Sequence, residues 1–218
     1  MKKIHLIESI ASFLASDNAG DSKGIYHPEE IKVHLNNVFN KAVYDSWLNG
    51  KRYSDFSQLD AWSKTYEVAV ASQIGAKAHG FLPFAPIQLP DAMGLRMISD
   101  HADVSTVFAP MESTASVVFA ELEVSTMDMT PTFSLEQNNL STGAGESSHM
   151  LRFDKLPVAP ATLITSVNVL LIQSLENMDD YDDVVMPSGM EDNIIQQVIA
   201  LMSKKGVPDV SNDMVITK

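Results

Sequence analysis

The residues that could do metal or acid–base chemistry form no recognised motif in this sequence. Six histidines occur singly, without the two-ligand spacing of a zinc site such as H-E-x-x-H. The chain has no cysteine, which removes thiolate metal sites, a cysteine nucleophile and disulfides. We therefore expect no metal, no cofactor and no catalytic residue of these kinds. The histidines are His5, His27, His34, His79, His101 and His149.

Serine and carboxylate chemistry is equally weakly indicated. The run "GAGESSH", residues 143–149, contains serines and a histidine, but it lies in a Gly/Ser-rich loop without the strand-to-helix elbow of a hydrolase nucleophile. Glu121 and Glu123 share one face of an expected strand, where a solvated sheet face explains them. A hydrolase with dispersed carboxylates remains a third hypothesis, because such pairs come from distant positions.

The acidic run "DDYDD", residues 179–183, is the one candidate cation site. Calcium prefers carboxylate oxygens, so four aspartates around Tyr181 could supply ligands. Adjacent aspartates on extended backbone point to opposite sides, however, and the run lacks EF-hand spacing. We favour a solvated acidic loop and leave cation binding open.

Composition and charge indicate a folded, acidic protein. Hydrophobic residues make up 45% and charged residues 20% of the chain, which is typical of a globular domain. The formal net charge of −13 repels nucleic-acid phosphates, so we expect no sequence-specific nucleic-acid binding. No run reaches the ~20 apolar residues of a membrane span. At the N-terminus, His5 and Glu8 interrupt a would-be signal sequence, so we expect an amphipathic helix.

Three helices are expected before residue 80. Apolar spacing predicts one over residues 3–15. Pro28 and two glutamates predict the start of a second helix, and Asn49-Gly50 predicts its end. A third helix is expected from about Phe56 to Ile74, because apolar residues recur there every three to four positions and would form one buried side.

Prolines between residues 80 and 94 then forbid a helix, and the following β-branched runs predict strands. The predicted strands are "STVFAPM", "ASVVFAELEVST", "PTFSLEQ", "SHMLRFD" and "ATLITSVNVLLIQS". The loop over residues 138–148 separates two of them and reads as a hairpin end.

The C-terminal helix is the most sharply punctuated element. Ser188 and Glu191 form an S-x-x-E capping box, and Gly206 with Pro208 predicts the stop. Its apolar face is broad, so we expect it to be covered from more than one side. That face contains Ile194, Ile195, Val198, Ile199, Leu201 and Met202.

Together these elements predict an α+β fold. The expected regions are N-terminal helices over residues 1–80, a β-rich antiparallel body over 81–186 that is sandwich- or barrel-like, and a C-terminal helix and tail over 187–218. We expect them to form one compact unit.

Two segments carry a family resemblance. "GIYHPEEIKVHLNNVFNKAVYDSW", residues 24–47, resembles an N-terminal pattern, and "PSGMEDNIIQQVIALM" followed by "VPDVSNDM" resembles a C-terminal pattern, of structural proteins of crAss-like and related tailed bacteriophages. The order of helices, β-rich middle and C-terminal helix agrees with that family. Where the family pattern has a basic residue after Pro-Ser-Gly, this chain has Met190, which removes any salt bridge from that position.

The resemblance implies a non-enzymatic virion protein, assembled in the host bacterial cytoplasm. The implied role is a ring or head-to-tail connector subunit, which forms a cyclic homo-oligomer around the DNA channel and contacts the portal protein and other tail proteins. A head-to-tail ring needs two complementary surfaces on each subunit. The expected assembly contacts are Ile31, Leu35, Phe39, Ile194, Val198, Leu201 and Met202. The alternative is a β-rich module that binds a small ligand or glycan, with residues 138–148 at its mouth.

Overall fold

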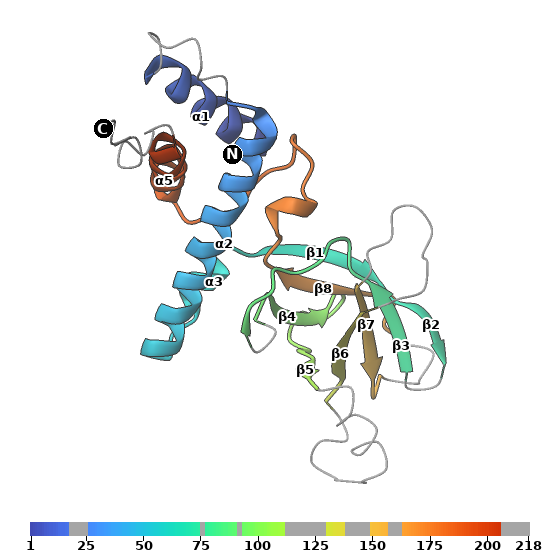
Figure 1. The fold of residues 1–218 in the computed structure, drawn as a ribbon. Coiled ribbons are helices and arrows are strands. Elements are labelled where there is room, and N and C mark those ends of the chain that lie inside the picture. The colour runs from blue at the N-terminus through green and yellow to red at the C-terminus, as the bar shows by residue number, and fades with distance from the viewer. Residues whose placement is uncertain are drawn as a thin grey trace, which may run out of the picture. The chain divides into compact units, whose positions relative to one another are not determined.

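The computed structural model shows an α+β protein made of two compact units. The helical unit combines Met1–Trp62 with Met178–Lys218, and the sheet unit is Ser63–Asn177 (Figure 1). The sheet unit is thus inserted into the sequence of the helical unit. The structure describes residues 1–17, 26–74, 77–90, 93–111, 130–137, 149–156 and 163–205.

The helical unit contains α1 (Lys3–Asp17), α2 (Pro28–Tyr53), the short α3 (Ser57–Asp60) and α5 (Met190–Lys205). The start of α2 follows the sequence prediction. Pro28 takes the first helical position, and His27 precedes it in extended conformation, where its ring nitrogen accepts from the Glu29 N–H at 3.4 Å. Acidic residues in the first turn and basic residues in the last turn complement the helix dipole.

The end of α2 differs from the prediction. The helix passes through Gly50 and ends at Tyr53, and Ser54 caps it in the left-handed conformation with φ 53°. Gly50 is needed inside the helix for another reason. A Cβ there would lie 2.6 Å from the Phe56 ring and 2.9 Å from the Asp55 carbonyl oxygen. The glycine therefore allows the following turn to fold back closely.

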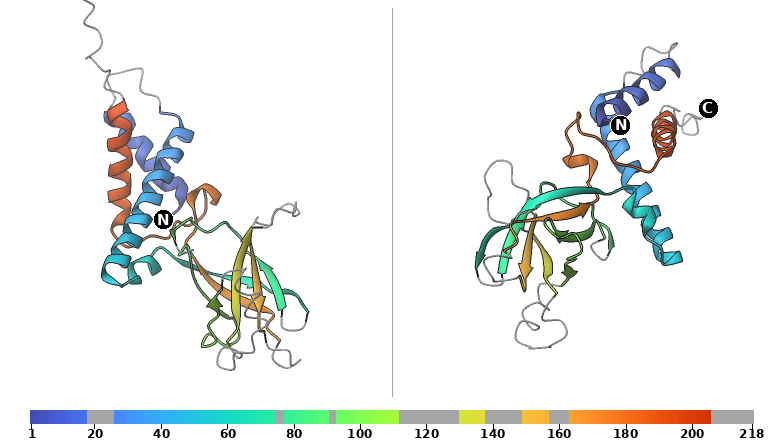
Figure 2. Two further views of the ribbon diagram at one scale, coloured as in Figure 1. Left: turned by 60° about the horizontal axis from the view of Figure 1, so that its bottom comes forward. Right: turned by 180° about the vertical axis from the view of Figure 1, so that it is seen from behind.

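Helices α1, α2 and α5 pack against one another around a shared apolar core (Figure 2). The broad face of α5 is covered by α1 and α2 of the same chain. Below them, Trp62 packs edge-on against Phe39 at 5.3 Å and donates its indole N–H to the Ser46 hydroxyl at 3.1 Å. The buried residues include Leu6, Ile10, Leu14, Ile31, Leu35, Phe39, Ile194, Val198 and Met202.

The predicted third helix is wrong beyond its first turn. Only Ser57–Asp60 is helical, and the chain then enters β1 (Lys64–Ala69) and β2 (Ala71–Ile74). The β-forming residues after Trp62 find a sheet partner far along the chain, since β1 pairs antiparallel with β8. That pairing overrides the local helical spacing. Leu59 and Trp62 are buried as expected.

The described residues of the sheet unit form two sheets. Beyond β1 and β2, its strands are β3 (Lys77–Phe81), β4 (Leu95–Asp100), β5 (Ala109–Pro110), β6 (Thr132–Gln137), β7 (His149–Asp154) and β8 (Ser166–Leu171), with a 3-10 turn at Leu175–Asn177. One sheet has the order β1-β8-β4 and the other β2-β3-β7-β6-β5. Their pairs are antiparallel except for β5 with β6.

Both sheets contribute to one core. Along β8, buried and half-buried residues alternate, so Val167, Val169 and Leu171 point inward. Leu151 and Phe153 of β7 meet them from the other sheet, and Phe108 packs edge-on against Phe153 at 5.5 Å. In the described strands, the two sheets of this unit therefore share one hydrophobic core.

Four of the five predicted strand segments contain strands, namely β5, β6, β7 and β8. The segment "ASVVFAELEVST", with Glu121 and Glu123, lies outside the described residues, as does the loop over 138–148. The strands that flank this loop pair with each other, with Gln137 opposite His149. Strands β1 to β4 were not predicted, and the helical region expected up to residue 80 stops at Trp62.

Candidate functional site

The seven residues predicted as assembly contacts occupy two different environments. Six of them are core residues of the helical unit with at most 2% of their surface exposed. Buried side chains cannot contact another subunit, so this part of the prediction is wrong. The sequence showed an apolar stripe but not its partner, which is another helix of the same chain. Only Leu201, at 45% exposure, remains available at the surface; the buried six are Ile31, Leu35, Phe39, Ile194, Val198 and Met202.

The helix cap is also displaced from its predicted position. Helix α5 begins at Met190, so the residue before its first turn is Gly189, with φ 84°. A capping box needs Ser188 directly before the helix and Glu191 at its third position. Here both lie one residue too early. The predicted stop at Gly206 and Pro208 lies outside the described residues.

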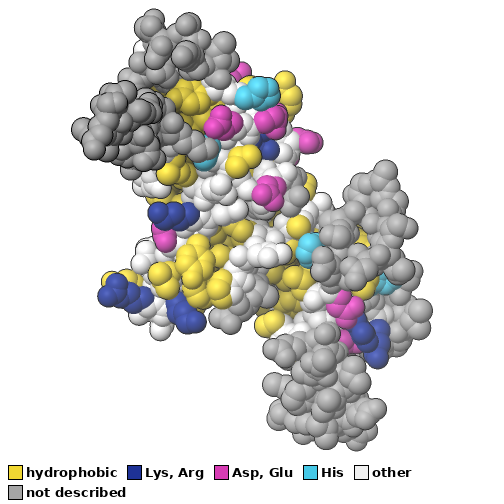
Figure 3. Space-filling view, in the orientation of Figure 1, with side chains coloured by type: hydrophobic (Ala, Val, Ile, Leu, Met, Phe, Trp, Pro, Cys, Tyr) yellow, Lys and Arg dark blue, Asp and Glu magenta, His cyan; other side chains and the backbone are white. Residues whose placement is uncertain are grey.

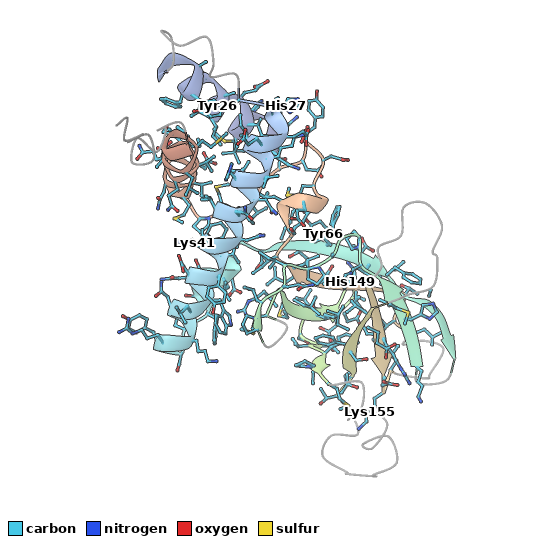
Figure 4. All side chains as sticks on the ribbon, in the orientation of Figure 1. Tyr26, His27, Lys41, Tyr66, His149 and Lys155 are labelled. Atoms are coloured by element: carbon cyan, nitrogen blue, oxygen red, sulfur yellow. The ribbon has the colours of Figure 1, made fainter. Side chains whose placement is uncertain are left out.

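The C-terminal half of α2 carries the most notable exposed surface of the helical unit. Lys41, Tyr44, Leu48, Lys51 and Arg52 follow the three- and four-residue spacing that places side chains on one helix face. All five are exposed, with Tyr44 at 44% and Leu48 at 49%. We call these five residues the basic-aromatic surface (Figure 3; Lys41 is labelled in Figure 4).

Ring contacts order this surface. Tyr44 lies against the buried Trp47, with ring centroids 5.3 Å apart, and the Lys51 ammonium stands 5.1 Å from the Trp47 ring. Arg52 lies 5.9 Å from the ring of Tyr53, which is 72% exposed. In the described part of the chain, the cations of this surface are not paired with carboxylates. The arrangement therefore offers ordered positive charge beside exposed apolar area.

The acidic loop, residues 179–183, is bound to the start of α1 by backbone hydrogen bonds. The Lys3 and Ile4 N–H groups donate to the carbonyls of Asp182 and Asp180 at 3.0 and 2.7 Å, and the Val184 N–H donates to the Met1 carbonyl at 2.8 Å. A helix start leaves N–H groups without helical partners. Here carbonyls of the loop accept from two of them.

Two lysines neutralise the central carboxylate of the loop. Lys32 lies 2.9 Å from Asp180, and the buried Lys3 lies 3.7 Å from it while donating to the Met178 carbonyl at 2.7 Å. The hydrogen bond from Lys32 lowers the pKa of Asp180 below 3.8. The same bond, with a second one to Glu29, raises the pKa of Lys32 above 10.5.

These contacts correct the expectation of a solvated acidic loop for one of its residues, Asp180. The inner aspartate, Asp180, is held by lysines, while Asp179, Tyr181 and Asp183 point outward. Among the described residues, no group of three histidine or acidic side chains is placed to hold a metal ion. The cationic partners of Asp180 in this structure are therefore lysine ammonium groups.

We predict that Asp180→Asn lowers the free energy of unfolding by about 1–2 kcal/mol at neutral pH, because Lys3 and Lys32 lose their carboxylate. Asp180 has a lowered pKa when folded, so its contribution is full above pH 3.8 and is lost as the pH falls through the folded pKa. The gap between wild type and variant should therefore close in acid. Urea unfolding across this pH range measures it.

Asp183→Asn is the matched control, since it removes a charge from the same loop without touching either lysine. If the difference in unfolding free energy between wild type and Asp180→Asn stayed constant with pH, or if Asp183→Asn lost as much stability, the stabilising role of the Asp180 carboxylate would be contradicted.

His101 contacts polar side chains from two strands of the smaller sheet. His101, after β4, has Nδ1 3.0 Å from the Asn168 side-chain oxygen, and Nε2 3.9 Å from a Glu67 carboxylate oxygen. His101 and Glu67 are each at least half exposed. This open position lacks the burial that tunes catalytic groups. The serines of "GAGESSH" lie outside the described residues, and His149 begins β7 (Figure 4).

The sequence was compared with protein-family models and with curated proteins, and nothing matches it in either comparison. In the described residues, no helix is long and apolar enough to cross a membrane.

Proposed function

We propose that this chain is a non-enzymatic structural subunit that assembles with copies of itself. The observation that carries the proposal is the basic-aromatic surface, where tyrosine and leucine side chains stand exposed on a long, rigid helix. Aromatic residues, arginine and leucine arranged on one helix face are a common form of protein contact. Unlike the buried stripe predicted from sequence, this face is available to a neighbour.

Within that class, we propose a ring or head-to-tail connector of a tailed bacteriophage, on the basis of the sequence resemblance. The order of N-terminal helices, β-rich middle and C-terminal helix supports this assignment. A net charge of −13 suits a ring through which DNA passes without binding. The portal protein and other tail proteins would be its neighbours in the virion.

The core shared by the described strands of the sheet unit supports assembly over the alternative of small-ligand or glycan binding. Inward side chains from both sheets are buried against one another. A ligand module would need an apolar pocket of its own.

The test is the oligomeric state of the purified chain and of Tyr44→Glu/Leu48→Glu. We expect light scattering and electron microscopy to show a closed oligomer for the wild type and a folded monomer for the variant, because two charges would enter the contact. The control is Phe13→Glu on α1, which changes an apolar residue of 58% exposure in the same unit. A wild-type chain that stays monomeric at every concentration, alone and with portal protein, would end the proposal.

A further inference from the structure

Among the described residues, no carboxylate forms an ion pair with the cations of the basic-aromatic surface. Lys51 and Arg52 lie over the rings of Trp47 and Tyr53, and Tyr44 and Leu48 remain about half exposed. The chain as a whole is strongly acidic, so a basic patch of this kind stands out electrostatically. A partner that fits it should present carboxylates together with an aromatic or apolar side chain.

The acidic loop of this protein has that chemistry. Tyr181 is 74% exposed, and Asp179 and Asp183, two residues to either side in the sequence, are exposed as well. The loop is fixed in shape. Lys2 and Asp183 form a β-bridge, the Asp182 N–H donates to the Asp179 carbonyl, and the Asp182 carboxylate accepts the Asp179 N–H. A preorganised loop loses little conformational entropy on binding.

The two surfaces cannot meet within one copy. The acidic loop is anchored to α2 at Lys32, in the second turn of the helix, by the bond to Asp180. Lys51 lies about 28 Å further along the same helix, at 1.5 Å per residue. Since α2 is one continuous helix from Pro28 to Tyr53, it holds the two surfaces apart.

We propose that the acidic loop of one copy docks on the basic-aromatic surface of the next copy. Asp179 and Asp183 pair with Lys51 and Arg52, and Tyr181 packs beside Tyr44 and Leu48. Two different surfaces on one subunit make a heterologous contact, which repeats head to tail and closes into a ring when the rotation allows it. This inference rests on the proposed function and names its contact.

The observations favour a protein partner over nucleic acid. Asp45 lies among the basic residues, where it would repel phosphate, and the net charge of −13 opposes a polyanion. The exposed side chains of Tyr44 and Leu48 favour a partner that buries them with an apolar or aromatic side chain, such as Tyr181 of the next copy.

The experiment exchanges the charges. We expect Lys51→Glu/Arg52→Glu and, separately, Asp179→Lys/Asp183→Lys to weaken self-association at least about 30-fold, because like charges then face each other. Both variants change exposed side chains, so their circular dichroism should match the wild type. Lys51→Glu/Arg52→Glu also reverses two charges at the C-terminal end of α2, so its melting temperature should fall slightly below that of the wild type. Light scattering across a concentration series reads the oligomeric state, and rising salt should weaken the wild-type contact.

Rescue separates this contact from a general loss of assembly. A 1:1 mixture of the two variants should reassemble with alternating subunits, and the fourfold variant should assemble alone, because each restores opposite charges at every contact. Glu8→Lys/Lys77→Glu is the control, since both residues are exposed, lie outside the two docking surfaces, and their exchange keeps the net charge of the chain.

The outcomes distinguish the two proposals. A monomeric wild type overturns the proposed function and this inference together. A wild-type oligomer that survives either double variant, or variants that fail to rescue one another, overturns this inference alone. Binding of a labelled DNA oligonucleotide that is lost in Lys51→Glu/Arg52→Glu, with the oligomeric state unchanged, would assign the surface to nucleic acid and overturn it as well.

Discussion

Val198→Glu should unfold the helical unit, whereas Leu201→Glu, one turn further along the same helix, should leave it folded. Val198 has no exposed surface, so its replacement removes a packed side chain and buries a charge without a partner. That cost is about 4 kcal/mol or more, a large part of a typical domain's stability. Leu201 is 45% exposed, so a charge there costs about 0.5 kcal/mol. Far-ultraviolet circular dichroism and urea unfolding measure both.

This pair also tests whether α5 is a core helix or an assembly contact. If Val198 made contacts between subunits, its variant would stay folded and lose only its oligomers. A helical signal equal to wild type in Val198→Glu would contradict the buried position, whatever its oligomeric state.

Gly94→Ala should destabilise the sheet unit by about 3 kcal/mol, the upper range for overpacking. An added Cβ would come 2.0 Å from the Ile87 carbonyl oxygen, which is backbone and cannot rotate away. Both segments are tied to the same neighbour, since Ile87 N–H donates to the Ile172 carbonyl and Ile172 N–H donates to the Gly94 carbonyl. Relief of the clash would therefore strain these bonds. Thermal unfolding measures the effect.

Gly80→Ala is the graded comparison. Its Cβ would lie 3.0 Å from the Ala69 carbonyl oxygen and from a Val68 methyl, a contact that small shifts relieve. We expect a loss of about 1 kcal/mol. Equal melting temperatures for the two variants would show that the segment at Gly94 yields more easily than its geometry indicates.

Helix starts and strand alternation were readable from the sequence because they depend on neighbouring residues. Pro28 and the glutamates after it mark the start of α2, and the alternation in β8 separates its two faces. The third helix failed because Trp62, Tyr66 and Val70 recur at helical spacing, while Tyr66, Val68 and Val70 also alternate as in a strand. Pairing with β8, about a hundred residues away, makes this segment a strand, and the local spacing of apolar residues carries no information about that partner.

The candidate site was harder to predict for a related reason. An apolar stripe shows that a helix face must be covered, but not whether the cover is the same chain or another one. Ile194 and Val198 are covered by α1 and α2, so the predicted contacts became core. The signal that was missed is the opposite one: Tyr44 and Leu48 lie exposed outside the buried stripe of α2. Among the described residues, the cations beside them form no ion pair with a carboxylate.

The insertion of the sheet unit into the helical unit has a consequence for biosynthesis. Helices α1 and α2 leave the ribosome before the sheet unit, but α5, which completes their core, is translated only after the whole of Ser63–Asn177. Until then Leu6, Ile31 and Phe39 lack their final cover, while the sheet unit can already form. The acidic loop that binds Lys3 is also translated after the sheet unit. A nascent chain therefore cannot present a finished helical unit before α5 has been translated.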